Sequence, residues 1–294
     1  MFKINEINTD GKPLSLSTPD GQLRIVFIGV GAAFAKRNRQ SNILIIQGDR
    51  HILVDCGTQG PLGLDDVGLS VLDLKCCLPT HSHSDHIGGY EEIMLMNRYM
   101  QGTKPELIIL SDFQDLLWRK SLSGGTEFSE VDEGRCLQLT DFFKIRRPKT
   151  IEFLGRKSWL YQHGPIEIII MRSRHFPSTA TSVDESQWCS GMLINQRVWI
   201  SGDTMFDYKY VERYHKDVEV MFHDCQLFTG GIHASYAELM TLPEEMRAKT
   251  ILYHYGDEWD CPEKWVKASD NFTGDPVKDG FMGWAQQQVA YDFL

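Results

Sequence analysis

Three histidines and an aspartate lie within six residues of one another, in the segment Thr80-His81-Ser82-His83-Ser84-Asp85-His86. Imidazole nitrogens and a carboxylate, without a thiolate, suit Zn²⁺ or a similar divalent ion and leave coordination positions open for water. On a tight turn from a strand to a helix, His81 and His83 could hold one cation while Asp85 and His86 face a second. The segment therefore predicts a catalytic metal centre.

The alternative is a histidine-rich surface loop that binds metal only by accident. Against it, the apolar run 71–78 reads as a buried strand that leads into the cluster, and Ile87-Gly88-Gly89 reads as the start of a helix directly after it. A short turn between two regular elements favours a built site.

Further ligand types occur directly after other apolar runs that read as strands. Because strand ends can present side chains to one cleft at the edge of a sheet, we expect these positions to contribute to the same site. They are Asp55, His175, Asp203, the pair His223-Asp224, and His254.

Together these motifs resemble the metallo-β-lactamase superfamily of metallohydrolases, in that family's order and over residues 23 to about 258. The resemblance implies an α/β fold, an αββα sandwich of two mixed β-sheets flanked by helices, with a dinuclear site at one edge. It implies two divalent ions, with Zn²⁺ expected and Mn²⁺ as the alternative. One ion would be held by His81, His83 and His175, the other by Asp85, His86 and His254, with Asp203 bridging them.

The bridging position separates branches of the superfamily. True β-lactamases usually place a cysteine there, so Asp203 argues against a β-lactam substrate. The segments Phe27-Ile28-Gly29-Val30-Gly31 and Ser41-Asn42 resemble ribonuclease Z and its phosphodiesterase relatives. Gly29-x-Gly31 is no dinucleotide-binding fingerprint, because position 34 is phenylalanine where that motif needs glycine.

The same branch implies a proton donor outside the metal ligands. His223-Asp224-Cys225-Gln226 corresponds to its His-Glu pair, and Ile232-His233-Ala234-Ser235 to its His-Ser-Thr segment. The resemblance makes His233 the general acid and Asp224 the residue that orients it, and it makes Asp85 part of the catalytic set. A loop histidine near a helix start is the alternative for His233.

Charge and cysteine content limit the possible partners. The 294 residues carry a formal net charge of -10, which gives no general attraction to nucleic acid. The chain has no apolar run long enough to span a membrane and no basic and apolar leader, so we expect no membrane association. Seven cysteines without a C-x-x-C pair favour a reducing cytoplasm.

The preferred function is a dinuclear phosphodiesterase, in which metal-activated hydroxide attacks a phosphodiester and a cyclic nucleotide is the substrate. Related phage and bacterial enzymes of this shape degrade cyclic nucleotides. Ribonuclease Z-like 3′ processing of RNA is the alternative, although the chain lacks a Gly/Pro-rich arm for transfer RNA and its basic cluster at 144–157 is a weak substitute. A lactonase or thioester hydrolase, and a binding protein that has lost its chemistry, also stay open. A homodimer is compatible with any of these.

Turn residues divide the chain into expected elements. No linker is evident, so we expect a single domain over residues 1–294, with an irregular insertion near 124–163 and a C-terminal tail from about 260. Helices are predicted at 65–69, 89–100, 112–122, 208–214 and 236–248. Strands are predicted at 23–28, 41–47, 51–55, 71–78, 107–110, 165–171, 191–194, 197–200, 218–222, 250–253 and 290–294.

Overall fold

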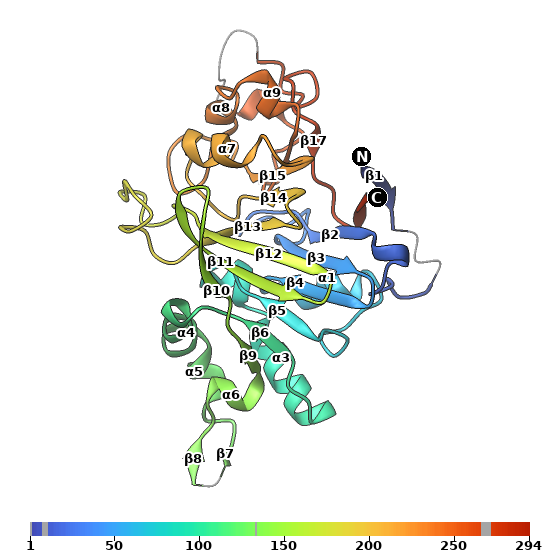
Figure 1. Cartoon of the computed structure of the whole chain (residues 1–294), viewed down its shortest axis with the longest axis vertical. Coiled ribbons are helices and arrows are strands. Elements are labelled where there is room, and N and C mark those ends of the chain that lie inside the picture. Colours follow the sequence, from blue (N-terminus) through green and yellow to red (C-terminus); the bar gives the residue numbers. More distant parts are fainter. Residues whose placement is uncertain (1, 8–10, 133, 266–271) are drawn as a thin grey trace. The chain divides into compact units, whose positions relative to one another are not determined.

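The computed structural model describes residues 2–7, 11–132, 134–265 and 272–294 (Figure 1). They form two compact units, each built on one mixed eight-stranded sheet. The sheet-1 unit contains Phe2–Gly29, Gln40–Pro148 and Gln288–Leu294. The sheet-2 unit contains Val30–Arg39 and Lys149–Gln287.

The first sheet has the strand order β1-β18-β2-β3-β4-β5-β6-β9. Neighbouring strands pair antiparallel from β1 through β18, β2 and β3 to β4. From β4 through β5 and β6 to β9 they pair parallel. The strands β2 and β3 are apolar and almost entirely buried, as expected for strands in the interior of a sheet. The bounds are β1 Phe2–Glu6, β2 Leu23–Gly29, β3 Asn42–Gln47, β4 Arg50–Val54, β5 Cys76–Leu78, β6 Glu106–Ile108, β9 Lys144–Arg146 and β18 Val289–Phe293.

The helices of the sheet-1 unit are short, and all except η1, which precedes β2, lie in the connections between its parallel strands (Figure 1). Two of them, α3 and α4, continue directly into π-helical turns. A two-stranded ribbon of β7 Val131–Asp132 and β8 Arg135–Cys136 precedes α6. The bounds are η1 Pro19–Gly21, α1 Gly60–Asp65, α2 Ser84–Ile87, α3 Tyr90–Met96, η2 Asn97–Gln101, α4 Ser111–Leu117, η3 Trp118–Leu122, α5 Ser123–Thr126 and α6 Leu139–Phe142.

The second sheet has the strand order β10-β11-β12-β13-β14-β15-β16-β17. Its first five strands pair antiparallel, and β14 to β17 pair parallel. The bounds are β10 Lys149–Phe153, β11 Arg156–His163, β12 Ile166–Arg172, β13 Ser190–Ile194, β14 Val198–Ile200, β15 Val220–Asp224, β16 Thr250–Tyr253 and β17 Gly283–Trp284.

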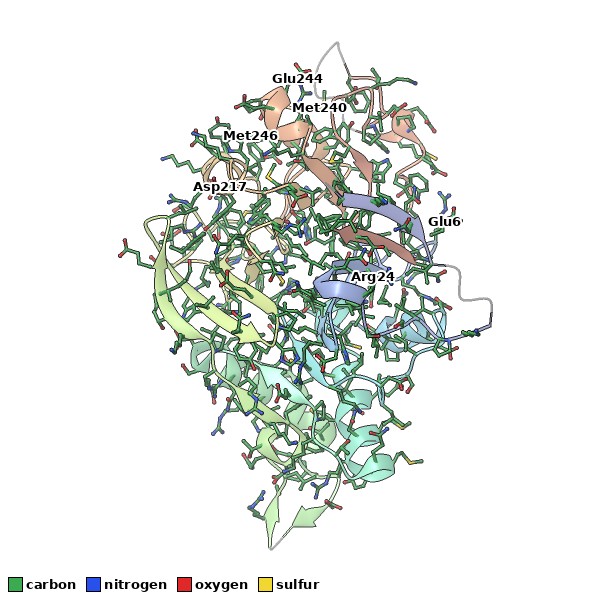
Figure 2. All side chains as sticks on the ribbon, turned by 45° about the vertical axis from the view of Figure 1, so that its right-hand side comes forward. Glu6, Arg24, Asp217, Met240, Glu244 and Met246 are labelled. Atoms are coloured by element: carbon green, nitrogen blue, oxygen red, sulfur yellow. The ribbon has the colours of Figure 1, made fainter. Side chains whose placement is uncertain are left out.

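The core of the sheet-2 unit lies where three short helices pack near β14 and β15 (Figure 1). These are α7 Tyr208–Tyr214, α8 Tyr236–Leu239 and α9 Glu244–Arg247, and a further 3-10 turn η4 spans Pro262–Lys264. Trp199 of β14 is fully buried against Tyr210 and Tyr214 of α7. Figure 2 shows Met240 next to α9, which carries Glu244 and the buried Met246.

Several sequence-based expectations about elements are wrong. The helix expected at 65–69 lies earlier, at Gly60–Asp65, where Pro61 occupies the first turn. Of the strand expected at 71–78, only Cys76–Leu78 is extended. The helix expected at 236–248 is two helices, because Pro243 precedes and caps α9.

The irregular insertion expected near 124–163 is in fact largely regular. Lys144–Arg146 forms the edge strand of the first sheet, and β10 and β11 form the first hairpin of the second. The β1 strand was not expected, because its alternating polar residues gave no apolar run. The C-terminal tail from about 260 falls partly at 266–271, outside the described residues, and ends in β18 as expected.

No disulfide joins the seven cysteines, all of which lie in the described part of the chain. Among the described residues, no helix is both long and apolar enough to cross a membrane.

Candidate metal centre

The histidine cluster lies in the sheet-1 unit, between β5 and α2. His81, Asp85 and His86 are buried, and His83 is the N-cap residue of α2. The Nε2 atom of His81 lies 2.9 Å from Nδ1 of His83, and Nε2 of His86 lies 3.3 Å from Oδ2 of Asp85. The four side chains thus form two pairs of adjacent donor atoms, His81 with His83 and Asp85 with His86.

Asp55, directly after β4, positions this cluster. Its carboxylate accepts hydrogen bonds from the backbone N–H of Thr80 (2.7 Å), the Thr80 hydroxyl (2.8 Å) and Nδ1 of His86 (2.7 Å). Because Nδ1 of His86 is held by Asp55, its Nε2 is turned toward Asp85. Burial raises the pKa of Asp55, although His86 and Thr80 oppose this. A cation bound at His86 would favour the ionised form of Asp55.

A glycine lets the loop after β4 approach α2 closely. A Cβ atom on Gly57 would lie 2.0 Å from the backbone oxygen of Asp85. The same loop is hydrogen-bonded to the cluster, since Cys56 N–H donates to the His86 carbonyl at 2.8 Å and Thr58 N–H to the Ser84 carbonyl at 3.1 Å. Any larger residue at position 57 would therefore displace the backbone that carries Asp85.

The other three predicted ligands lie together in the sheet-2 unit. His175 follows β12, Asp203 follows β14, and His254 follows β16. All three are buried, and Oδ2 of Asp203 lies 3.7 Å from Nε2 of His175 and 3.4 Å from Nε2 of His254. The Asp203 carboxylate is therefore central to this group.

Backbone geometry fixes the three residues. Gly202 has φ +62°, and a Cβ atom there would lie 2.2 Å from the Ser190 carbonyl oxygen, so glycine is required beside Asp203. Nδ1 of His175 is 2.8 Å from the carbonyl oxygen of Ile232. His254 itself has φ +59°, an uncommon conformation for a non-glycine residue.

His233 lies beside these ligands in the same unit. Its Nδ1 is 2.8 Å from Oδ2 of Asp224, and its ring stacks on that of His254 at 4.7 Å between centroids. The ring of His175 approaches it edge-on at 4.8 Å. The side chain of His233 is 18% exposed, whereas that of Asp224 is fully buried. His233 is thus the solvent-accessible member of a buried group.

Asp224 is built to stay ionised. It is the last residue of β15, and its carboxylate also accepts the Thr204 N–H at 3.1 Å. Burial alone would raise its pKa, but hydrogen bonds with His223 and His233 outweigh burial and hold the pKa below its usual value. An ionised carboxylate accepts a hydrogen bond from Nδ1–H of His233 and leaves Nε2 as the atom for proton transfer.

The donor set fits divalent metal. Imidazole nitrogens and carboxylate oxygens, without cysteine, are ligands of catalytic zinc and manganese sites. Three of the histidines have Nδ1 held by a protein oxygen: His81 by the Thr80 hydroxyl (3.1 Å), His86 by Asp55 and His175 by Ile232. This second layer of contacts is typical of histidines that bind metal through Nε2.

Comparison with known proteins places the chain in a family. The family model described as "Anti-Pycsar protein Apyc1" matches residues 23–291. A protein of that name from Bacillus phage BSP38 is 33% identical over 272 residues, which cover 91% of this chain and 97% of the relative. One from Bacillus phage 010DV004 is 34% identical over 275 residues, covering 92% and 98%. The chain belongs to the Anti-Pycsar protein Apyc1 family.

Solved structures show the fold of this Apyc1 family member. The metallo-β-lactamase fold protein YhfI from Bacillus subtilis superposes with a TM-score of 0.63 at 17% identity, over 92% of this chain and 100% of that protein. The short form of human tRNase Z gives a TM-score of 0.59 at 16% identity, over 91% and 98%. The chain therefore has the metallo-β-lactamase fold, as its motifs predicted.

Sequence reasoning missed groups that orient the side chains of the candidate site. Thr80, the Ile232 carbonyl and Thr204 orient His81, His175 and Asp224 respectively. Thr80 could have been noticed as a hydroxyl directly before the first histidine. The Ile232 carbonyl leaves no trace in the sequence, because any residue supplies a backbone oxygen.

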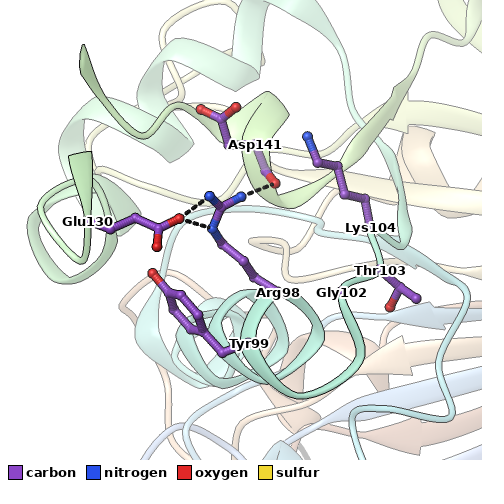
Figure 3. Close-up of a pocket in the computed structure, with 7 residues that line it drawn as sticks. All are labelled: Arg98, Tyr99, Gly102, Thr103, Lys104, Glu130 and Asp141. Atoms are coloured by element: carbon purple, nitrogen blue, oxygen red, sulfur yellow. Dashed lines mark hydrogen bonds and ion pairs between the residues drawn. The ribbon is translucent and has the colours of Figure 1, made fainter. Parts of the chain in front are cut away.

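A polar hollow of about 280 Å³ also lies on the sheet-1 unit (Figure 3). The charged side chains that line it already have partners within the protein. Arg98 pairs with Glu130 at 2.7 Å and donates to the Asp141 carbonyl at 3.4 Å, and Lys104 donates to the Thr140 carbonyl at 2.8 Å. We assign this hollow a structural role.

Proposed function

We propose that this Apyc1 family member is a dinuclear metal-dependent phosphodiesterase that hydrolyses a cyclic nucleotide. The observation that carries the proposal is the pair His233–Asp224, which stands beside His175, Asp203 and His254 without being needed as a ligand. A histidine bound to a metal ion through its imidazole nitrogen cannot deliver a proton from that atom, whereas His233, held by Asp224, can act as a proton donor. A phosphodiester with a poor leaving group needs such a donor.

The proposed ligands are those that the sequence predicted. His81, His83 and His175 would hold one ion, and Asp85, His86 and His254 the other, with Asp203 shared. Two divalent ions bound there would lower the pKa of a water molecule and neutralise charge on the phosphate oxygens. The order of the ligands along the chain and the buried, oriented histidines support this assignment.

His233 would protonate the departing ribose oxygen. Its Nδ1–H donates to the ionised Asp224, which fixes the orientation of the ring and leaves Nε2 to face the substrate. Its partial exposure lets Nε2 reach a bound substrate and recover a proton from water afterwards. This is the division of roles that an acid and its orienting carboxylate require.

A cyclic nucleotide is the substrate that we prefer. The family name is consistent with the degradation of such a molecule. The net charge of -10 does not favour a polyanion held through many phosphates. The free, mostly buried cysteines suit a reducing compartment such as the cytoplasm, where cyclic nucleotides occur.

One panel tests the proposal. Protein reconstituted with Zn²⁺ or Mn²⁺ is assayed against cyclic nucleotides, a transfer-RNA precursor and a series of lactones. We expect ring opening of a cyclic nucleotide to the linear nucleotide, and close to two metal ions per chain by elemental analysis. Asp203→Ala should lower both metal content and turnover while most of the fold survives. Hydrolysis of lactones alone, or one ion or none in the wild type, would contradict the proposal.

A further inference from the structure

An almost fully exposed phenylalanine stands at the tip of a tight turn in the sheet-2 unit. The Ala35 N–H donates to the Ala32 carbonyl at 3.1 Å, which closes a turn with Ala33 and Phe34 as its central residues. Phe34 is 87% exposed. Other large apolar side chains are exposed too, such as Phe128 at 71%, so exposure alone assigns Phe34 no role.

The turn is attached to the residue after a proposed metal ligand. Gly31 forms a parallel bridge with Tyr255, and hydrogen bonds join Ala32 N–H to the Tyr255 carbonyl (3.0 Å) and Tyr255 N–H to the Val30 carbonyl (3.3 Å). Tyr255 directly follows His254. Two Cα–Cα steps of about 3.8 Å separate Phe34 from Ala32, so its backbone is held close to the strand end that carries His254.

The other side of the turn is fixed to the same segment. The backbone N–H groups of Lys36 and Arg37 donate to the Asp257 carboxylate at 2.9–3.0 Å. The Arg37 guanidinium forms two hydrogen bonds of 2.7 Å with Asp260 and lies over the Trp259 ring. Phe34 therefore projects from a loop whose backbone is bound on both sides to residues 255–260.

We infer that Phe34 is a substrate-binding residue that stacks on the base of the nucleotide. This rests on the proposed function. A rigid platform loses little conformational entropy when a base stacks on it, and an aromatic ring accepts any base because every base has a π-face. The loop that carries Phe34 is bonded to Tyr255, which directly follows His254, and the ring of His254 stacks on that of His233.

A second exposed aromatic residue provides the comparison. Phe228 is 60% exposed in the loop that leads to His233. Cε2 of its ring would lie 4.0 Å from a Cβ atom on Gly231, so the ring packs beside that glycine. Phe34 has the greater exposure and the more firmly bound loop, and the inference is made for it alone.

The test measures the binding and hydrolysis of one cyclic nucleotide by Phe34→Ala, Phe34→Leu and Phe34→Trp. We expect Phe34→Ala to raise KM and lower kcat/KM by about 5- to 150-fold, the range for loss of one base–aromatic stack, with kcat little changed. The KM of Phe34→Leu should lie between the values of the wild type and Phe34→Ala, and Phe34→Trp should keep the wild-type KM. Metal content and melting temperature should stay at wild-type values, because the side chain is exposed. Phe128→Ala, at a phenylalanine that is 71% exposed in the sheet-1 unit, is the matched control and should change nothing.

The outcomes separate this inference from the proposed function. A wild-type protein that hydrolyses no cyclic nucleotide removes the proposed function and the inference together. An active wild type with Phe34→Ala unchanged, or with Phe228→Ala carrying the loss in KM instead, overturns the inference alone. A change in oligomeric state by size-exclusion chromatography with unchanged KM would show Phe34 to be a contact between two copies, which also overturns it.

Discussion

Orientation of the imidazole rings is the central feature at the scale of single residues. His81, His86 and His175 each have Nδ1 held by a protein oxygen, and these oxygens come from a hydroxyl, a carboxylate and a backbone carbonyl. The ligand types and their spacing were readable from the sequence, because they occur in one short segment and at strand ends. The holding oxygens were not, because they depend on which loops meet in the folded chain.

Asp55 offers the first test at this scale. Asp55→Ala would remove the acceptor of His86 Nδ1 and of both Thr80 donors. We expect metal affinity to fall about 10- to 100-fold, the usual effect of losing such a partner. Metal-competition titration with a chromophoric chelator measures it. Asp66→Ala, at an exposed aspartate after α1, serves as control. Unchanged affinity in Asp55→Ala would show that the ring of His86 is held by packing alone.

His233 is expected to act in chemistry and not in metal binding. His233→Ala should keep two metal ions but lose roughly 10²–10⁴ in kcat on a cyclic nucleotide, the range for a positioned proton donor. A substrate with a p-nitrophenolate leaving group needs little protonation and should be much less affected. Steady-state kinetics on both substrates gives the comparison. Equal losses on the two, or loss of a metal ion, would remove the general-acid assignment.

At the scale of elements, apolar runs located most strands, while helix ends were harder to place. The helix Tyr208–Tyr214 and the strand Thr250–Tyr253 have the predicted bounds, since both are flanked by clear polar residues. Residues 124–163 were misjudged because their strands are edge or hairpin strands with many exposed polar side chains. Such strands bury too little surface to show an apolar pattern.

The short helix α6 gives a test of stability at this scale. Asp141 forms a capping box with Gln138 and pairs with Arg135 at 2.6 Å. The hydrogen bond from Arg135 lowers the pKa of Asp141 from 3.8 to about 2. Because the folded pKa lies below the unfolded one, the stabilisation is present above pH 4 and is lost as the pH falls through about 2.

Asp141→Asn should therefore lower the free energy of unfolding by about 1 kcal/mol at pH 7, a value reduced for the solvent exposure of Arg135. The difference from wild type should shrink toward acid pH. Urea unfolding between pH 3 and 7 measures it. Asp115→Asn removes an exposed pair with Arg119 and should have no measurable effect. If the loss in unfolding free energy caused by Asp141→Asn stays constant with pH, the capping box with Gln138 and not the ion pair with Arg135 accounts for it.

At the scale of the whole molecule, the net charge bears on whether the substrate is a cyclic nucleotide or a long RNA. The net charge is -10, and two of the basic residues that might have bound RNA are already engaged. Arg146 pairs with Glu106 at 2.5 Å, and Arg147 donates to the Ile109 carbonyl at 2.6 Å and to Gln114. Their guanidinium groups thus support β6, β9 and α4 within the sheet-1 unit, which weakens the case for a ribonuclease.

The salt dependence of kcat/KM distinguishes a cyclic-nucleotide substrate from a long RNA. A long RNA binds through many phosphates, so its affinity falls steeply with salt, whereas a cyclic mononucleotide carries a single phosphate charge. We expect kcat/KM for a cyclic nucleotide to change little between low and physiological salt. Replacing Arg146, Arg147 and Lys149 together by Gln should leave that value nearly intact, although the loss of the Arg146–Glu106 pair can lower the melting temperature slightly. Efficient cleavage of a transfer-RNA precursor that collapses with salt, or with the triple substitution in a protein that is still folded, would instead establish the ribonuclease function.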